Sequence, residues 1–237
     1  MNVRVWLISA ILGIAALPAS AEPPRVVELF VSQNCPACPK AEDNIRALKE
    51  TEPDFLPIVW VVDYWDYLGS PDPMAVPVSS KRQRVYAERF GLRGPYTPQL
   101  VMNGMAQTAG NRRGAVRRLL RNGDVIPDDT WGIIEQQDEK LLVRRNELAP
   151  EAEFFVLTVT QIERNGGLLE NVVTAVRDFG PVESEATFSA ADCAGRCIAV
   201  LQAMDCGPLL AILPFDVASA EVPKETVNPL VAVAGAQ

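Results

Sequence analysis

The chain has 237 residues, with 30 acidic and 22 basic side chains, so its formal net charge is −8 at pH 7. This acidic balance argues against nucleic-acid binding. The chain has no histidine, which removes the commonest acid–base group and a frequent metal ligand.

The first 21 residues have the pattern of a secretory signal peptide. Arg4 precedes an apolar run over residues 5–17, and the small residues 19–21 form a cleavage site that ends at Ala21. The run is shorter than the roughly 20 residues that a membrane-spanning helix needs, and no later segment is long and apolar enough to span. We therefore expect a mature protein that begins at Glu22, is periplasmic or secreted, and has no membrane span.

The mature sequence is long enough for two compact domains, and its charge changes along the chain. Residues 22–125 carry 14 basic and 12 acidic side chains, whereas residues 126–237 carry 7 and 18. We predict an α/β domain over residues 22–125, with a central mixed sheet flanked by helices. A small antiparallel β-sandwich-like domain is predicted over residues 126–217, followed by a disordered tail over residues 218–237.

Two cysteines follow the first predicted strand. Residues 25–31 are apolar and β-branched, which is typical of a buried strand, and the helical spacing of apolar residues over 39–52 predicts a helix. Cys35 is then expected at or just before the helix N-terminus, where the unpaired N–H groups favour a thiolate. Cys38 is expected one turn further in, close enough to Cys35 for a disulfide.

A Cys-x-x-Cys pair has three interpretations, namely a redox-active pair, a structural disulfide, or half of a zinc site. A structural zinc site needs four ligands, but Cys193, Cys197 and Cys206 are remote and irregularly spaced, and there is no histidine. The strand, cysteine pair and helix in this order favour redox chemistry, so we expect no metal and no other cofactor.

Residues 58–62 predict a second buried strand, which leads into an aromatic loop at 63–69. Trp65 and Tyr67 in this loop either line a binding surface at the end of the strand or cap the core, and the sequence leaves both interpretations open. Next come a helix over 79–90, a hairpin of two short strands that turns at Asn103 and Gly104, and a helix between 111 and 123.

Short strands dominate the second half. Their spacing and the turn residues between them are typical of an antiparallel sandwich. The predicted strands cover residues 131–136, 140–144, 153–162, 171–177, 197–202 and 209–213.

The order of motifs resembles a thioredoxin-like domain. More narrowly, it resembles a bacterial secreted family of thioredoxin-like proteins that is catalogued as a domain of unknown function. The matching motifs are Val27-Glu28-Leu29-Phe30, Ser32-Gln33, Cys35, Cys38-Pro39, residues 63–69, Arg82-Gln83-Arg84 and Tyr96-Thr97-Pro98-Gln99.

The resemblance implies roles for several of these residues. Cys35 matches the exposed attacking thiol, Cys38 the resolving thiol, and Pro98 the cis-proline beside the pair. Glu28 is similar in placement to a buried carboxylate that takes a proton from the resolving cysteine, although a surface or ion-paired Glu28 is an equal alternative. We expect substrate to be bound by four aromatic-loop and proline-loop residues: Trp65, Tyr67, Tyr96 and Thr97.

The leading hypothesis is an exported thiol–disulfide oxidoreductase whose partners are protein thiols or disulfides. The alternatives are a non-catalytic binding module with a structural disulfide, and a copper-delivery protein that uses Cys35 and Cys38. Solvent access to the Cys35 sulfur distinguishes the first two. Burial under the Trp65 loop favours the inert module, whereas exposure beside Pro98 favours exchange.

The remaining three cysteines predict a second disulfide, between Cys193 and Cys197. Cys193 lies just before the predicted strand 197–202 and Cys197 at its start, whereas Cys206 lies in the turn at its far end. At about 3.3 Å per residue, a straight strand places Cys206 out of bonding reach of Cys197, so we expect a free Cys206.

Overall fold

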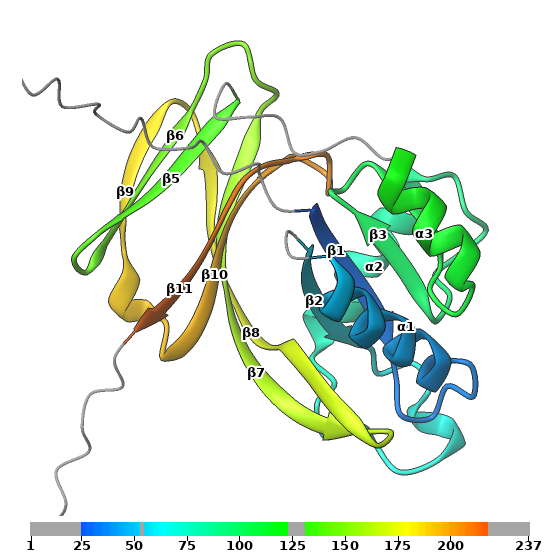
Figure 1. Ribbon diagram of the computed structural model, residues 1–237. Helices are drawn as coiled ribbons and strands as arrows, with labels where there is room; N and C mark the ends of the chain where they lie inside the picture. Colours follow the sequence, from blue (N-terminus) through cyan, green and yellow to red (C-terminus); the bar gives the residue numbers. More distant parts are fainter. Residues whose placement is uncertain (1–24, 53–54, 123–130, 218–237) are drawn as a thin grey trace, which may run out of the picture.

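The computed structural model describes residues 25–52, 55–122 and 131–217 (Figure 1). Within these residues the chain is a mixed α/β protein with an eight-stranded mixed sheet, helices, and a three-stranded antiparallel sheet. The predicted signal peptide (1–21) and the predicted tail (218–237) lie outside the described residues. None of the described helices is both long and apolar enough to cross a membrane.

The elements follow the predicted order closely. The first half contains β1 (Arg25–Val31), α1 (Cys38–Thr51), β2 (Phe55–Val61), the 3-10 helix η1 (Asp66–Leu68), α2 (Pro77–Arg89), β3 (Gln99–Met102), β4 (Ala106–Ala109) and α3 (Arg113–Asn122). The second half contains β5 (Gly132–Gln137), β6 (Lys140–Arg145), β7 (Ala152–Arg164), β8 (Gly167–Val182), β9 (Glu185–Ser189), the 3-10 helix η2 (Ala190–Asp192), β10 (Gly195–Ala203) and β11 (Leu209–Val217). The strand β9 is not predicted by the sequence.

Strands from both halves join the large sheet. Its order is β11-β10-β7-β8-β2-β1-β3-β4, and the smaller sheet has the order β5-β6-β9. β1 pairs in parallel with β2, and β2 meets β8 in parallel where Val59 pairs with Val172. The predicted domain boundary between residues 125 and 126 thus separates strands that share one sheet, and the division into two domains stays a prediction.

Alternating side chains of β1 supply two different cores. Val27, Leu29 and Val31 point to the face covered by α1 and α3, which we call the α1-side core. Val26 and Phe30 point to the opposite face, the α2-side core, which continues onto β7, β8 and β10. Figure 1 shows α1 and α3 in front of this end of the sheet and α2 behind it. Two faces buried by helices explain why β1 is a nearly continuous apolar run.

A third core lies between the two sheets. It collects apolar side chains of β5 and β6 with the inner faces of β7, β10 and β11, and we call it the inter-sheet core. The alternation of β7 separates its residues, since Phe154 and Val156 face the inter-sheet core whereas Phe155 and Leu157 face the α2-side core. Both faces of this part of β7 are therefore buried.

Candidate functional site

A disulfide joins Cys35 and Cys38 between β1 and α1. Their Cα atoms are 5.4 Å apart, as a disulfide requires. The Cys35 N–H donates to the Ser32 carbonyl at 3.2 Å, and the Cys38 N–H donates to the Cys35 carbonyl at 3.1 Å. Cys38 is the first residue of α1, which corrects the expectation that it lies one turn inside the helix. Pro39 follows in the first turn, where its missing N–H has no helical partner to lose.

Both sulfur-bearing residues are buried in the α1-side core. Cys35 is 2% exposed and Cys38 is 0% exposed. Leu29 of β1 and the partly buried Trp65 belong to the same cluster. The closed disulfide is therefore screened from solvent, as expected for a non-catalytic binding module with a structural disulfide.

Residues 63–72, which we call the covering loop, carry the aromatic side chains next to the cysteines. The Trp65 indole N–H donates to the Thr97 hydroxyl at 2.7 Å, which joins two of the predicted substrate-binding residues. Trp65 also stacks on Tyr67, with ring centroids 6.4 Å apart. Tyr67 is 79% exposed. One end of this aromatic pair thus packs on the core beside the disulfide and the other faces solvent.

The residues just before Cys35 fasten the covering loop. The Gln33 side-chain amide donates to the carbonyls of Ser70 and Pro71 at 2.8 and 3.0 Å. The Asn34 amide donates to the Ser70 carbonyl at 3.0 Å, and the Gln33 backbone N–H donates to Asp72 Oδ2 at 2.8 Å. The loop and the cysteine turn therefore form one hydrogen-bonded unit.

The predicted proline lies beside α1. The Thr97–Pro98 peptide bond is cis, and the Pro98 carbonyl accepts a hydrogen bond from the Gly110 N–H at 2.9 Å. A Cβ atom at Gly110 would lie 2.9 Å from Leu29 Cδ1, 3.2 Å from Ala41 Cβ and 3.6 Å from Pro98 Cβ. Glycine is thus required where the proline, β1 and the first turns of α1 converge.

Tyr96 is directed differently from the other predicted substrate-binding residues. Its hydroxyl donates to Gln107 Oε1 on β4 at 2.5 Å. Burial raises its pKa, which Arg112 partly offsets. Tyr96 therefore supports the proline loop from the β4 side, while Thr97 bonds to Trp65 of the covering loop.

Glu28 does not face the cysteine pair. It lies one residue before Leu29 on β1, so its side chain points to the α2-side face. There its carboxylate accepts hydrogen bonds from Arg82 Nε at 2.5 Å and Arg82 Nη2 at 2.9 Å. It also accepts a hydrogen bond from the Tyr86 hydroxyl. The expected proton transfer from Cys38 to Glu28 is corrected by this geometry, and the ion-paired alternative is the one observed.

Arg82 is the centre of a buried polar cluster on this second face. Desolvation lowers its pKa, but the neighbouring Glu28 carboxylate, Tyr86 and Cys206 together outweigh that effect and hold the pKa above its usual value. Arg82 also donates to Gln202 Oε1 at 2.7 Å and lies 3.7 Å from the Cys206 sulfur. All five cysteines are described, and Cys206 is the one outside a disulfide, as predicted. Burial raises the Cys206 pKa to about 11.

The second predicted disulfide, Cys193–Cys197, is also present. Its Cα atoms are 6.4 Å apart, and both residues are buried in the inter-sheet core. The Thr158 hydroxyl lies 3.3 Å from the Cys193 sulfur. This disulfide joins the end of η2 to the start of β10, far from any of the predicted catalytic residues in sequence.

Sequence reasoning missed a group of charged residues beside the covering loop. Arg164 Nη2 lies 3.0 Å from Asp72 Oδ2, and Arg164 Nε lies 3.4 Å from Glu42 Oε1. Burial raises the Glu42 pKa, while a hydrogen bond from Asn165 and the charge of Arg164 lower it in part. Arg164 is in a turn more than a hundred residues after the cysteines, and no motif marks it.

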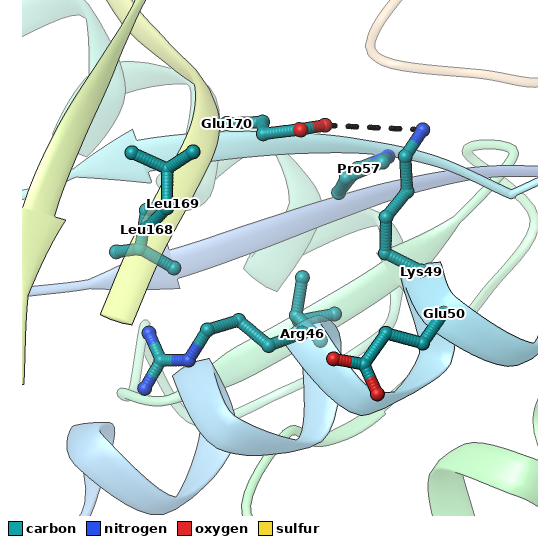
Figure 2. Close-up of a pocket in the computed structure, with 8 residues that line it drawn as sticks. Arg46, Lys49, Glu50, Pro57, Leu168, Leu169 and Glu170 are labelled. Carbon is teal, nitrogen blue, oxygen red and sulfur yellow. Dashed lines mark ion pairs between the residues drawn. The ribbon is translucent and has the colours of Figure 1, made fainter. Parts of the chain in front are cut away.

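Figure 2 shows a separate cavity of about 320 Å³ between α1 and the start of β8. Two basic residues, Arg46 and Lys49 of α1, and two acidic residues, Glu50 of α1 and Glu170 of β8, line the cavity. Lys49 Nζ lies 3.9 Å from Glu170 Oε2. None of the predicted site residues lines it. Within the described residues, no three Cys, Asp or Glu side chains gather as a metal site would require.

Two solved structures are similar to the chain in fold. A crystal structure of a protein from Agrobacterium tumefaciens is similar, with a TM-score of 0.67 and 22% identity over 83% of this chain and 96% of that one. HBP35 of Porphyromonas gingivalis is similar with a TM-score of 0.55 and 11% identity over 91% of this chain and 82% of that one. These identities support a likeness of fold alone. Curated protein sequences contain no match.

A family model described as a protein of unknown function (DUF1223) matches residues 26–166. The matched segment starts in β1, contains the cysteine turn, the covering loop and the proline loop, and ends in the β7–β8 turn that carries Arg164. On this match over more than half of its length, the chain belongs to the DUF1223 family.

Proposed function

We propose that the protein is an exported, thioredoxin-like thiol–disulfide exchange protein, with Cys35 as the attacking thiol and Cys38 as the resolving thiol. The observation that carries the proposal is the position of the disulfide. It joins the first residue of α1 to the turn that follows β1, in the core against which Trp65 packs.

A structural role explains this disulfide poorly. It closes a loop of only four residues, so the loop-entropy model assigns it about 2 kcal/mol. The start of α1 is already held by the apolar contacts of Ala41 and Ile45 and by Pro39 in the first turn. The bond adds little order to a segment that is otherwise secured.

The position suits exchange chemistry. Cys35 precedes the positive end of α1, so after reduction its thiolate is favoured. The Cys35 thiolate attacks a substrate disulfide, forming a mixed disulfide and releasing one substrate thiolate. Cys38, deprotonated, then attacks the Cys35 sulfur, which restores the Cys35–Cys38 bond and releases the second substrate thiolate. Two electrons pass from the protein to the substrate in this direction, and the reverse sequence oxidises a substrate dithiol.

Exchange requires the covering loop to move, because Cys35 is nearly fully buried in the disulfide state. Tyr67 and Leu68 at the apex of this loop are both exposed. An apolar surface next to the cysteines suits contact with a partner protein, since exposed apolar groups that cluster mark interaction sites. Displacement of Trp65 by the partner then gives access to the sulfur.

The burial of Cys35 favours a second candidate, a binding module with an inert disulfide. In that case the covering loop stays closed, and Tyr67 and Leu68 serve as a docking surface alone. The two candidates differ in the reducibility of one bond.

The test is a redox titration of a Cys193→Ala, Cys197→Ala, Cys206→Ala variant, in which every redox signal belongs to Cys35–Cys38. Turnover is measured in the same variant by insulin reduction and by oxidation of a dithiol peptide. We expect a potential above about −300 mV and turnover in at least one direction. A potential below that value, with no turnover in either direction, would establish the inert module, and circular dichroism confirms that the variant is folded.

A further inference from the structure

Arg164 ends β7, at the turn of the β7–β8 hairpin, and its side chain lies between two buried carboxylates. One is Glu42, which follows Cys38 by one turn of α1, and the other is Asp72, which ends the covering loop. The Arg164 side chain is 10% exposed, and the two carboxylates are more deeply buried. A residue of the second half of the chain thus bridges the two elements that enclose the cysteines.

Asp72 organises the covering loop. Its Oδ2 accepts the Gln33 N–H at 2.8 Å, and its Oδ1 accepts the Met74 N–H at 3.1 Å. Its own N–H donates to Asp66 Oδ1 at 3.1 Å. These bonds tie together both ends of the loop and the turn before Cys35. Both oxygens of the Asp72 carboxylate therefore serve as acceptors for backbone donors.

A buried carboxylate of this kind needs a neighbouring cation. Arg164 supplies it at 3.0 Å, and the same guanidinium also lies beside Glu42. Among the described residues, Glu42 Oε1 accepts no hydrogen bond, so the Arg164 ion pair is its polar contact. Removal of Arg164 takes an ion pair from both carboxylates at once, and of the two only Glu42 is shown to have a second favourable charge beside it, that of Arg46.

The turn that carries Arg164 is itself held against α1. Arg46 Nη1 donates to the Arg164 carbonyl at 3.4 Å, and Asn165 donates to Glu42 Oε2. Gly167 gives Arg46 room, since a Cβ there would lie 2.7 Å from Arg46 Nε. Figure 2 shows the Arg46 side chain extended from α1 toward the start of β8. The position of the guanidinium of Arg164 is therefore set by the hairpin turn.

We propose that Arg164 is a positioning residue of the cysteine site, which holds the covering loop closed and so sets the access of solvent and partner thiols to Cys35. Without Arg164, Asp72 loses the cation beside it and turns toward water, its bonds to Gln33 and Met74 weaken, and the loop that carries Trp65 opens. The role of this access in exchange rests on the proposed function, whereas the control of access itself does not.

The test compares the two disulfides within one molecule. Wild type, Arg164→Gln and Arg164→Lys are reduced with a phosphine, and at each time point the new thiols are alkylated and assigned by peptide mass spectrometry. Arg196→Gln, at an exposed residue of β10, is the matched control. In Arg164→Gln we expect Cys35–Cys38 to be reduced tenfold faster or more, as for the loss of a hydrogen bond to a charged group.

The reduction of Cys193–Cys197 is expected to be unchanged, and Arg164→Lys is expected to restore most of the protection. Equal acceleration of both disulfides would show general destabilisation and overturn the proposal, as would an unchanged Cys35–Cys38 rate. Asp72→Asn tests the same ion pair from the loop side, in case Arg164→Gln does not fold. Phosphine reduction needs no exchange activity, so a protein without turnover that still shows Arg164-dependent protection would refute the proposed function alone.

Discussion

Cys35–Cys38 and Cys193–Cys197 each close a short loop, and each lies in an apolar core. Around Cys193–Cys197 the core is formed by the facing strands of two sheets, whose backbones are paired along their lengths. Around Cys35–Cys38 the core is formed by β1, α1 and their neighbours in the sheet, and Trp65 of the covering loop packs against it. The first environment is fixed by sheet ladders and the second by side-chain hydrogen bonds and an ion pair.

The exposed fraction of a disulfide in the folded structure therefore does not by itself determine how readily the disulfide reacts. Opening the inter-sheet core breaks backbone ladders, whereas opening the covering loop breaks a few polar contacts of Gln33, Trp65 and Asp72. Local opening free energies vary widely within one protein, and loops lie at the low end. Equal burial is therefore compatible with unequal accessibility of the two bonds.

The largest expected difference between the two disulfides is in the trapping of partners. Cys38→Ser should accumulate mixed disulfides through Cys35, because the resolving thiol is absent. Cys35→Ser should trap none, and neither should Cys193→Ser or Cys197→Ser. The measurement is non-reducing electrophoresis of the affinity-purified protein from the cells that express it. Trapping by Cys197→Ser at the level of Cys38→Ser would remove the functional distinction between the two bonds.

Glu28→Gln tests whether the two faces of β1 act independently. The substitution leaves the Arg82 guanidinium buried without its anion, so we expect a loss of about 3–5 kcal/mol in the free energy of unfolding. The reduction rate of Cys35–Cys38 should stay unchanged, since Glu28 points away from it. Urea unfolding and timed phosphine reduction give the two quantities, and a changed reduction rate with unchanged stability would return Glu28 to the cysteine site.

Cys206 is buried like the four disulfide-bonded cysteines, and as a free thiol it tests how far burial alone protects a cysteine. Its pKa is raised to about 11, chiefly by burial and in spite of Arg82. Less thiolate is present at pH 8, so alkylation should be about 100-fold slower than for a free thiol of ordinary pKa, and should accelerate as pH rises toward 11. Labelling at the rate of the urea-unfolded protein would show that burial in this fold gives no protection.

Removal of the second disulfide by a Cys193→Ala, Cys197→Ala pair should affect stability alone. Its short loop predicts a loss of about 2 kcal/mol in the free energy of unfolding. Exchange activity at Cys35–Cys38 should remain at the wild-type level. Urea titration and insulin reduction check the two statements, and a loss of activity in the folded variant would tie the inter-sheet core to the cysteine site.

The smallest expected effect concerns the contact of Trp65 with Thr97. Thr97→Val removes the acceptor of the indole N–H, which is worth about 1 kcal/mol, so Cys35–Cys38 should be reduced several-fold faster. Thr187→Val, at an exposed residue of β9, is the matched control. A rate for Thr97→Val that equals this control would show that the bond to Thr97 does not hold the cover in place.

The local features of the molecule could be predicted from the sequence. Apolar alternation and turn residues locate the strands within a few positions, and cysteine spacing predicts both disulfides and the free Cys206. These features depend on neighbours in the sequence, where the physical rules are strong. The length of β8 and the presence of β9 were not predicted, because the exposed residues of these strands weaken the apolar pattern.

Two other features depended on information that is not local. Glu28 is one position away from the side of β1 that faces the cysteines, and a one-residue offset reverses the face of every side chain in a strand. Arg164 approaches Asp72 only because β7 and β8 join the sheet beside β2, and no pattern in a single sequence encodes that pairing. The aromatic loop at 63–69 was predicted from the sequence, but the ion pair between Asp72 and Arg164 was not.

The junction of β2 with β8 has a mechanical consequence. Among the described residues, the ladder between these strands comprises the Val59–Val172 pair, whereas β1 and β2 pair along seven residues each. Asn171 reinforces the junction from one side by donating to the Pro57 carbonyl at 2.8 Å. A pulling force that separates β2 from β8 meets few backbone bonds in parallel, so the sheet should yield there first. Such a separation would also strain the contacts that Arg46 and Glu42 of α1 make with the β7–β8 turn.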